Sequence, residues 1–326
     1  MRRFNASELK TFENLTSLTQ KELHKVMTKY LHSKYKKVVS AKKYIYAIGD
    51  IPIALVSHMD TVFPDPPSEI FYDAHKNVVW GDGGLGADDR AGIFAIIKLI
   101  EKGYRPSVIL TTDEEVGGVG ASALARKKCP FPGLKYMIEL DRQGSNDCVF
   151  YQQYNPLFVD YIEDFGFVEA WGTYTDICEL TSAWNICGVN LSIGYIDEHS
   201  LSERLYVGSF FKTIERVETM LNQKEIPHFE YKEMSYGQIY KSFYGDLFND
   251  DFSCIRCNSC KNEFPEYDVF PIKGLNGKTL HYCCDCVVDG DIDWCNNCGE
   301  AFESDGTDGH ICLDCRRAMG EDYKNV

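Results

Sequence analysis

Four apolar segments in the first 200 residues each end in a cluster of acidic or histidine side chains, and this pattern most constrains the fold. The segments are 53–57, 107–112, 136–140 and 189–195, and the clusters after them are His58-Met59-Asp60, Asp113-Glu114-Glu115, Asp141 and His199. Helical patterns cover 7–38, 86–102 and 202–224. Apolar strands that alternate with helices predict an α/β fold with a mostly parallel central sheet flanked by helices. Sites in such sheets form at the carboxyl ends of the strands, so we expect these clusters to meet.

The 14 cysteines divide the chain unevenly. Four precede residue 254 (Cys129, Cys148, Cys178 and Cys187), and ten lie between Cys254 and Cys315. The opening residues lack the apolar stretch of a secretory signal, so a cluster this dense indicates metal ligation rather than disulfides. We therefore predict a catalytic domain over 1–225, a linker over 226–250 and a tandem zinc-ribbon region over 251–326.

Composition and charge narrow the classes of partner. Hydrophobic residues make up 44% and charged residues 25% of the chain, which is ordinary for a folded protein. No apolar run approaches the ~20 residues of a membrane span. The formal net charge of -15, from 34 basic and 49 acidic residues, opposes a phosphate backbone. We expect a cytoplasmic protein with no nucleic-acid or membrane partner.

Five clusters carry the candidate chemistry: SHMDTVF, GLGADDRAG, TTDEEVGG, ELDRQG and DEHSLSER. Each alone has a simpler interpretation, such as a helix cap or a solvated loop. Together, each near the end of a predicted strand, they suit two zinc ions bridged by one carboxylate. Such a pair needs a bridging anion to offset its repulsion and a further carboxylate as a base.

This ordered series resembles the di-zinc exopeptidases, the superfamily of peptidase T, the aminoacylases and the bacterial zinc aminopeptidases, over residues 45–220. The resemblance implies that His58 and Asp141 hold one zinc and that Glu115 and His199 hold the other. It also implies that Asp88 bridges the two ions and that Asp60 orients the ring of His58. Glu114 is then the general base that accepts a proton from water and passes it to the leaving amine.

The sequence departs from peptidase T-like enzymes in two places. Arg90 stands where those enzymes usually have lysine, which keeps the charge. The segment between Asp141 and His199 is too short for their inserted lid or dimerisation domain of ~100 residues. It is closer to the single-domain aminopeptidases, in which GTYTD over 172–176 resembles a substrate-side Gly-x-Ser-Asp segment. Asp176 would there contact a free α-amine, or else it is a turn residue.

The resemblance implies a metal-dependent hydrolase that cleaves peptide or amide bonds, and we favour an aminopeptidase-type exopeptidase. The alternatives are an N-acyl amino acid deacylase, a carboxypeptidase and a catalytically silent zinc-ribbon adaptor. The expected substrate is a short peptide or an N-acyl amino acid. Co²⁺ or Mn²⁺ would also suit the catalytic pair.

The tail contains two units with zinc-ribbon spacing. One comprises Cys257, Cys260, Cys283 and Cys286, and the other Cys295, Cys298, Cys312 and Cys315. They predict two structural zinc ions, which makes four zinc ions in all, and leave Cys254 and Cys284 as surplus thiols. Residues 250–326 carry 16 acidic and 7 basic side chains, a net charge of 7 - 16 = -9. That charge favours a protein partner or a stabilising role for the ribbons over a nucleic acid.

Overall fold

The chain divides into two compact units, Met1–Glu233 and Met234–Val326, in a computed structural model. The structure describes residues 2–153, 155–234, 254–265, 269–274, 278–283, 286–287, 292–303 and 310–319. Each unit is described by itself.

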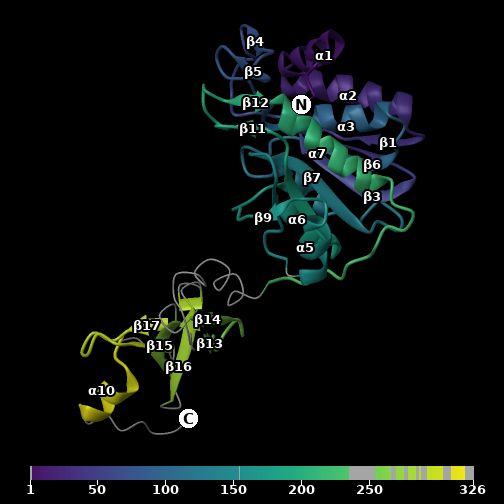
Figure 1. The fold of residues 1–326 in the computed structure, drawn as a ribbon. Helices are drawn as coiled ribbons and strands as arrows, with labels where there is room; N and C mark the ends of the chain where they lie inside the picture. Colours follow the sequence, from purple (N-terminus) through teal and green to yellow (C-terminus); the bar gives the residue numbers. More distant parts are fainter. Residues whose placement is uncertain are drawn as a thin grey trace. The chain divides into compact units, whose positions relative to one another are not determined.

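The first unit is built on an eight-stranded sheet of order β1-β2-β6-β3-β7-β10-β8-β9 (Figure 1). Its four central strands, β6, β3, β7 and β10, are parallel, whereas β1, β2 and β8 pair antiparallel toward the edges. The bounds in sheet order are β1 (Lys37–Ser40), β2 (Tyr44–Ile48), β6 (Pro106–Thr111), β3 (Ile51–His58), β7 (Tyr136–Arg142), β10 (Gly188–Ser192), β8 (Asp147–Val149) and β9 (Val168–Glu169). The predicted α/β fold with a mostly parallel centre is confirmed.

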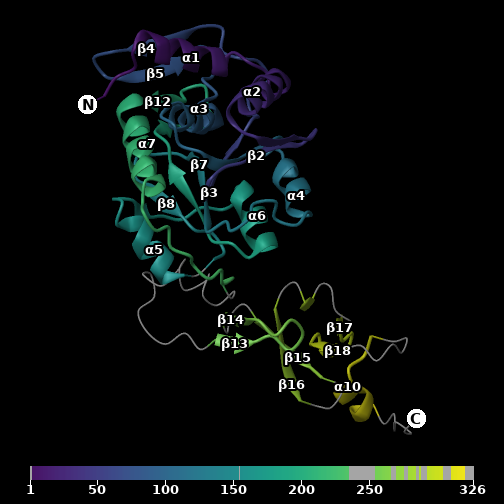
Figure 2. The ribbon, with the colours of Figure 1, turned by 90° about the vertical axis from the view of Figure 1, so that its right-hand side faces the viewer.

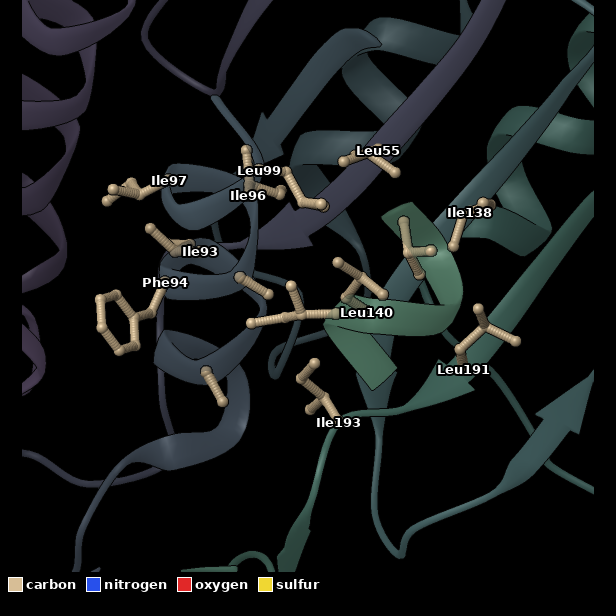
Figure 3. Close-up of a cluster of buried hydrophobic side chains, with 14 of the residues drawn as sticks. Leu55, Ile93, Phe94, Ile96, Ile97, Leu99, Ile138, Leu140, Leu191 and Ile193 are labelled. Atoms are coloured by element: carbon tan, nitrogen blue, oxygen red, sulfur yellow. The ribbon is translucent and has the colours of Figure 1, made fainter. Parts of the chain in front are cut away.

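Helices cover both faces of this sheet, because alternate strand residues enter two different apolar cores. Ile53 and Leu55 of β3 join the larger core, whereas Ala54 and Val56 join the smaller one. The helices of the larger core are α1 (Ala6–Thr16), α2 (Gln20–Lys34), α3 (Ala87–Glu101), α5 (Pro156–Glu163) and α7 (Val207–Leu221). The smaller core contains α4 (Val119–Ala125) and α6 (Asp176–Trp184), which lie on the other side in Figure 2. Figure 3 shows the apolar side chains of α3 beside Leu55, Ile138 and Leu140 of the sheet.

A second, antiparallel sheet joins two segments that are distant in the sequence. Its order is β11-β12-β5-β4, from β4 (Ile70–Asp73), β5 (Val78–Gly81), β11 (Tyr195–Ile196) and β12 (Arg204–Tyr206). Pairing of β12 with β5 places the loop that carries His199 next to the segment that precedes α3.

Three predicted elements have different bounds in the structure. The helical pattern over 7–38 breaks at Ser17–Leu18, because Thr19 and Glu22 form a capping box that starts a new helix, and β1 takes the end of the pattern. The pattern over 202–224 begins with β12, so α7 starts only at Val207. Within the predicted linker, Phe229 is buried in the first unit, and residues 235–250 lie outside the described part of the chain.

The second unit consists of short strands around cysteines. β13 (Cys254–Arg256) pairs with β14 (Glu263–Pro265), and a further sheet has the order β16-β15-β18-β17. Its strands are β15 (Val269–Lys273), β16 (Thr279–Cys283), β17 (Ile292–Trp294) and β18 (Ala301–Glu303), and α10 (Leu313–Ala318) follows them. Among the described residues of both units, no helix has the length and apolar character needed to cross a membrane.

Candidate metal centre

The histidine and carboxylate clusters meet at the carboxyl ends of the central parallel strands. His58 is the last residue of β3, Glu114 and Glu115 follow β6, and Asp141 lies near the end of β7. Asp88 lies in the first turn of α3, and His199 lies in the loop between β11 and β12. The topology thus brings together all the residues of the first unit that the sequence indicated as metal ligands.

Asp88 lies at the centre of this cluster and faces a histidine with each oxygen. Its Oδ1 is 3.1 Å from His58 Nε2, and its Oδ2 is 3.2 Å from His199 Nε2. Beyond them, His58 Nε2 is 3.4 Å from Asp141 Oδ1, and His199 Nε2 is 3.0 Å from Glu115 Oε2. One carboxylate therefore separates two histidine–carboxylate pairs.

Three overlapping groups have the spacing of metal ligands. Within each group, one ligand atom per residue lies within 4.8 Å of the others. The groups are His58–Asp88–Asp141, Asp88–Glu115–His199 and His58–Glu114–Glu115. The first two share only Asp88, which is the arrangement that two neighbouring divalent ions need.

Local hydrogen bonds explain why Asp88, and not Asp89, faces the histidines. The carboxylate of Asp89 accepts hydrogen bonds from Ser57 Oγ and from the backbone N–H of Gly92, the latter at 2.8 Å. The guanidinium of Arg90 is buried and donates to the backbone carbonyls of Met59, Asp60 and Leu18. These contacts turn the side chains of Asp89 and Arg90 into the protein and leave Asp88 facing His58 and His199.

Asp60 connects two of the clusters. Its Oδ1 accepts a hydrogen bond from the backbone N–H of Glu114 at 3.0 Å, and its Oδ2 accepts one from Glu115 at 3.1 Å. The same Oδ1 is 3.4 Å from His58 Nδ1. Asp60 thus lies against the ring that it was predicted to orient, and it also fixes the backbone that presents both glutamates.

The crowding of carboxylates shifts their pKa values. Burial, together with the charge of Asp141, raises the pKa of Glu114 to about 9. Burial and the charge of Asp88 raise the pKa of Glu115 to about 7. Hydrogen bonding to Asp88 raises the pKa of His199 to about 9. Burial opposes ionisation of Asp88, but hydrogen bonds from His199 and His58 hold its pKa below the ordinary range.

The donor set fits divalent ions. Glu115 Oε1 is buried and has no hydrogen-bond partner among the described residues. Buried polar atoms without partners are costly, and several carboxylates at one point repel each other. Carboxylate and imidazole together suit zinc, cobalt and manganese, and a divalent charge would offset the repulsion.

Other residues that support the site were not identified from the sequence. Thr175 Oγ1 donates to Asp141 Oδ2 at 3.0 Å, and Tyr195 Oη donates to Asp141 Oδ1 at 3.1 Å. The carboxylate of Glu203 accepts hydrogen bonds from backbone N–H groups at the start of α3. Their hydrogen-bond partners are distant along the chain, so no local pattern indicates these contacts. The sequence offered one signal, which is that these residues lie close to Asp176 or His199.

Asp176, left open between an amine contact and a turn, lies in the first turn of α6 and is fully buried. Its Oδ2 accepts a hydrogen bond from Thr111, and its Oδ1 has no partner among the described residues. Glu139, which the sequence did not indicate, is also fully buried and accepts the backbone N–H of Ile177 at 3.2 Å. Burial raises the pKa of both carboxyls, that of Asp176 to about 7, and the charge of Asp176 in turn raises the pKa of Glu114.

The second unit holds two groups of four cysteines, each with one sulfur per residue within 4.8 Å of the others. They are the two sets expected from the spacing: Cys257, Cys260, Cys283 and Cys286, and Cys295, Cys298, Cys312 and Cys315. In the first group the backbone N–H of Cys283 donates to Cys257 Sγ at 3.4 Å, as a thiolate prefers. The side chain of Cys254 and the whole of Cys284 lie outside the described part.

No protein-family model matches the sequence, and no curated protein matches it significantly. Solved structures do match the fold. An aminopeptidase of the TET type from a marine-sediment thaumarchaeote is 14% identical, with a TM-score of 0.54, over 68% of this chain and 97% of that one. A tripeptidase from Staphylococcus aureus is 14% identical, with a TM-score of 0.53, over 66% and 98%. The aminopeptidase PepT from Bacillus cereus is 17% identical, with a TM-score of 0.50, over 65% and 96%. The predicted resemblance to the exopeptidases is thereby confirmed at the level of the fold.

Proposed function

We propose that the first unit is a metal-dependent exopeptidase that removes an amino-terminal residue from short peptides. The observation that carries this proposal is the position of Asp88, whose two oxygens face His58 and His199 on opposite sides. One carboxylate between two histidine–carboxylate pairs is the ligand set of a bridged two-metal site. The likeness of fold to solved aminopeptidases supports the same conclusion.

In this proposal His58, Asp88 and Asp141 hold one divalent ion, and Asp88, Glu115 and His199 hold the other. Zinc is the expected ion, with cobalt or manganese as substitutes. Two ions in such a site polarise a peptide carbonyl and lower the pKa of a water molecule. Asp60 keeps His58, Glu114 and Glu115 in place through the contacts described above.

Glu114 is the proposed general base. It lies beside His58 and Glu115, but it belongs to neither of the two groups that share Asp88. A carboxylate beside the two groups that is not itself a ligand can accept a proton from water and return it to the leaving amine. Its backbone, fixed by Asp60, limits how far the carboxylate can turn away from the substrate.

We favour a substrate with a free amine, because the solved structures that match the fold include aminopeptidases. Charge does not decide the substrate class: the five carboxylates of Asp60, Asp88, Glu114, Glu115 and Asp141, when ionised, are balanced by two divalent ions and the buried guanidinium of Arg90. A hydrolysis screen separates an aminopeptidase from a carboxypeptidase and a deacylase.

The second unit is proposed to bind two structural zinc ions through its two groups of four cysteines. Sites with four thiolates are closed and leave no position for a substrate. We assign this unit to stabilisation or to contact with a protein partner.

The test is a hydrolysis screen with aminoacyl, N-acyl and carboxypeptidase substrates, with and without a chelator. We expect aminoacyl substrates to be cleaved, chelator to abolish cleavage and added metal to restore it. The Asp88→Ala variant is the control, and we expect it to be inactive and to lack both catalytic ions. Equal behaviour of Asp88→Ala and the unmodified chain toward every substrate class would overturn the proposal in favour of a silent adaptor.

A further inference from the structure

Glu203 is a fully buried carboxylate whose partners lie far from it in the sequence. It follows His199 by four residues and directly precedes β12. Its Oε2 accepts the backbone N–H groups of Gly86 at 2.6 Å and Ala87 at 3.2 Å, and its Oε1 accepts the N–H of Asp88 at 3.0 Å. One side chain thus binds three consecutive amides.

These three amides belong to the turn that precedes the regular part of α3, because Asp88 and Asp89 have non-helical φ and ψ angles. Gly86 occupies the capping position and has no side chain to bind them. Glu203 supplies the acceptors for these N–H groups and so fixes the shape of the turn. The loop that carries His199 is thereby joined to the turn that carries Asp88.

The remaining contacts of this turn leave Asp88 dependent on Glu203. Asp89 and Arg90 are held from the other side by Ser57, Gly92 and the backbone carbonyls described above. The hydrogen bond from the N–H of Asp88 to Glu203 fixes the backbone of the residue that faces both histidines. A shift of this amide would move Asp88 relative to His58 and His199 together.

We propose that Glu203 is a positioning residue for the group Asp88–Glu115–His199, a role that rests on the proposed two-metal function. It fixes two of the three members of this group: Asp88 through the backbone N–H of that residue, and His199 through the loop that carries both His199 and Glu203. Of these two residues, the group His58–Asp88–Asp141 contains only Asp88. Loss of Glu203 should therefore weaken the second group more than the first.

A purely structural helix cap would give a different result, and the chain offers a matched control. Glu8 is also buried, 6% exposed, and its Oε2 accepts the backbone N–H of Asn5 at the start of α1 at 3.1 Å. It has no contact with the candidate ligands among the described residues. Glu8→Gln and Glu203→Gln each replace a buried carboxylate that accepts backbone N–H groups by an amide of the same shape, and Glu8→Gln also removes ion pairs with Arg2 and Lys98.

The experiment measures Mn²⁺ binding to the full-length chain after chelation of its weakly held ions, for the unmodified protein, Glu203→Gln, Glu203→Ala and Glu8→Gln. Mn²⁺ is chosen because carboxylate and imidazole bind it, whereas thiolates prefer softer ions. Calorimetry gives the two affinities, and electron paramagnetic resonance detects the spin-coupled ion pair. Thermal unfolding of each metal-free variant monitors folding.

We expect Glu203→Gln to weaken the second Mn²⁺ site by about 10–100-fold and to reduce the spin-coupled signal. Glu8→Gln should lower the melting temperature but keep both affinities. Folded Glu203 variants that bind two ions as tightly as the unmodified chain would refute the positioning role. If Glu203→Ala fails to fold, the Mn²⁺ affinities of Glu203→Gln alone test the positioning role. Failure of the unmodified chain to bind an Mn²⁺ pair would instead count against the proposed function.

Discussion

At the scale of single residues, the site depends on which of two adjacent carboxylates is free and which is held. Asp88 and Asp89 have the same side chain, yet Ser57 and Gly92 bind only Asp89. Glu114 and Glu115 are likewise adjacent, yet only Glu115 lies within 3.0 Å of His199. The surrounding hydrogen bonds, rather than the residue types, thus separate a candidate metal ligand from its neighbour.

The adjacent glutamates allow a direct test of their different roles. We expect Glu114→Gln to lower kcat by about 10²–10⁴-fold and to leave the metal content intact, because only a general base is lost. Glu115→Gln should lower the metal content of the catalytic unit, because it removes a proposed ligand. Metal analysis by mass spectrometry and turnover of an aminoacyl substrate give both quantities. Loss of an ion from Glu114→Gln, with Glu115→Gln fully loaded, would reverse the two roles.

At the scale of elements, the close approach of α3 to β7 requires a glycine. A Cβ on Gly92 would lie 2.4 Å from the backbone oxygen of Leu140 and 2.5 Å from the carboxylate of Asp89. The helix can therefore approach the strand that carries Asp141 while the Gly92 N–H still binds Asp89.

Gly92→Ala should therefore destabilise the protein, although alanine favours a helix over glycine by about 1 kcal/mol. Overpacking typically costs about 1–3 kcal/mol, so we expect a lower free energy of unfolding in urea. Gly83→Ala is the comparison, because a Cβ there meets no atom within 4 Å and only the positive φ of 89° is strained. A Gly92→Ala protein that is more stable than the unmodified chain would show that α3 can move away from β7.

The sequence was sufficient to predict the elements of the site but not the contacts that join them. β3 is apolar up to Ser57 and His58, and β7 is apolar apart from Glu139 until it reaches Asp141, so their place in the sheet follows from local pattern. The Glu203 contact spans 115 or more residues, and no local pattern predicts it. The break between α1 and α2 did have a local signal, Thr19 and Glu22, but the apolar pattern on both sides obscured it. The second sheet was missed because its four strands are only two to four residues long.

At the scale of the whole molecule, the clustered acids connect stability with pH and metal. The pKa of Glu114 rises from 4.5 to about 9, and that of Glu115 rises from 4.5 to about 7, both chiefly through burial. The pKa of His199 rises from 6.5 to about 9 through its hydrogen bond with Asp88. The folded metal-free protein therefore binds more protons than the unfolded chain between about pH 5 and pH 9, and its stability falls as pH rises through this range.

We expect the melting temperature of the chelated protein to fall from pH 5 to pH 8, and added Mn²⁺ to raise it most at pH 8. Metal and protons compete for the same carboxylates and imidazoles, so affinity should increase as pH rises. Calorimetric scans at pH 5, 6, 7 and 8, with and without Mn²⁺, test both effects. An equal rise in melting temperature at every pH would show that the ions bind elsewhere.

The last prediction concerns the limits of the first unit and the total metal content. Contacts divide the chain after Glu233, and Phe229 packs with Phe158 at 4.8 Å and Tyr161 at 5.2 Å between ring centroids. We expect a chain that ends at Glu233 to fold, to hold two ions and to keep its hydrolytic activity, whereas the full chain holds four.

A chain that ends at Glu225 loses Phe229, and deletion of a buried phenylalanine ring typically costs about 3–5 kcal/mol, so this shorter chain should unfold at a clearly lower temperature. Metal analysis, turnover and thermal unfolding of the three chains provide the comparison. A folded chain ending at Glu233 that binds two ions but cleaves no substrate of the full chain would mean that the cysteine-rich unit completes the active site.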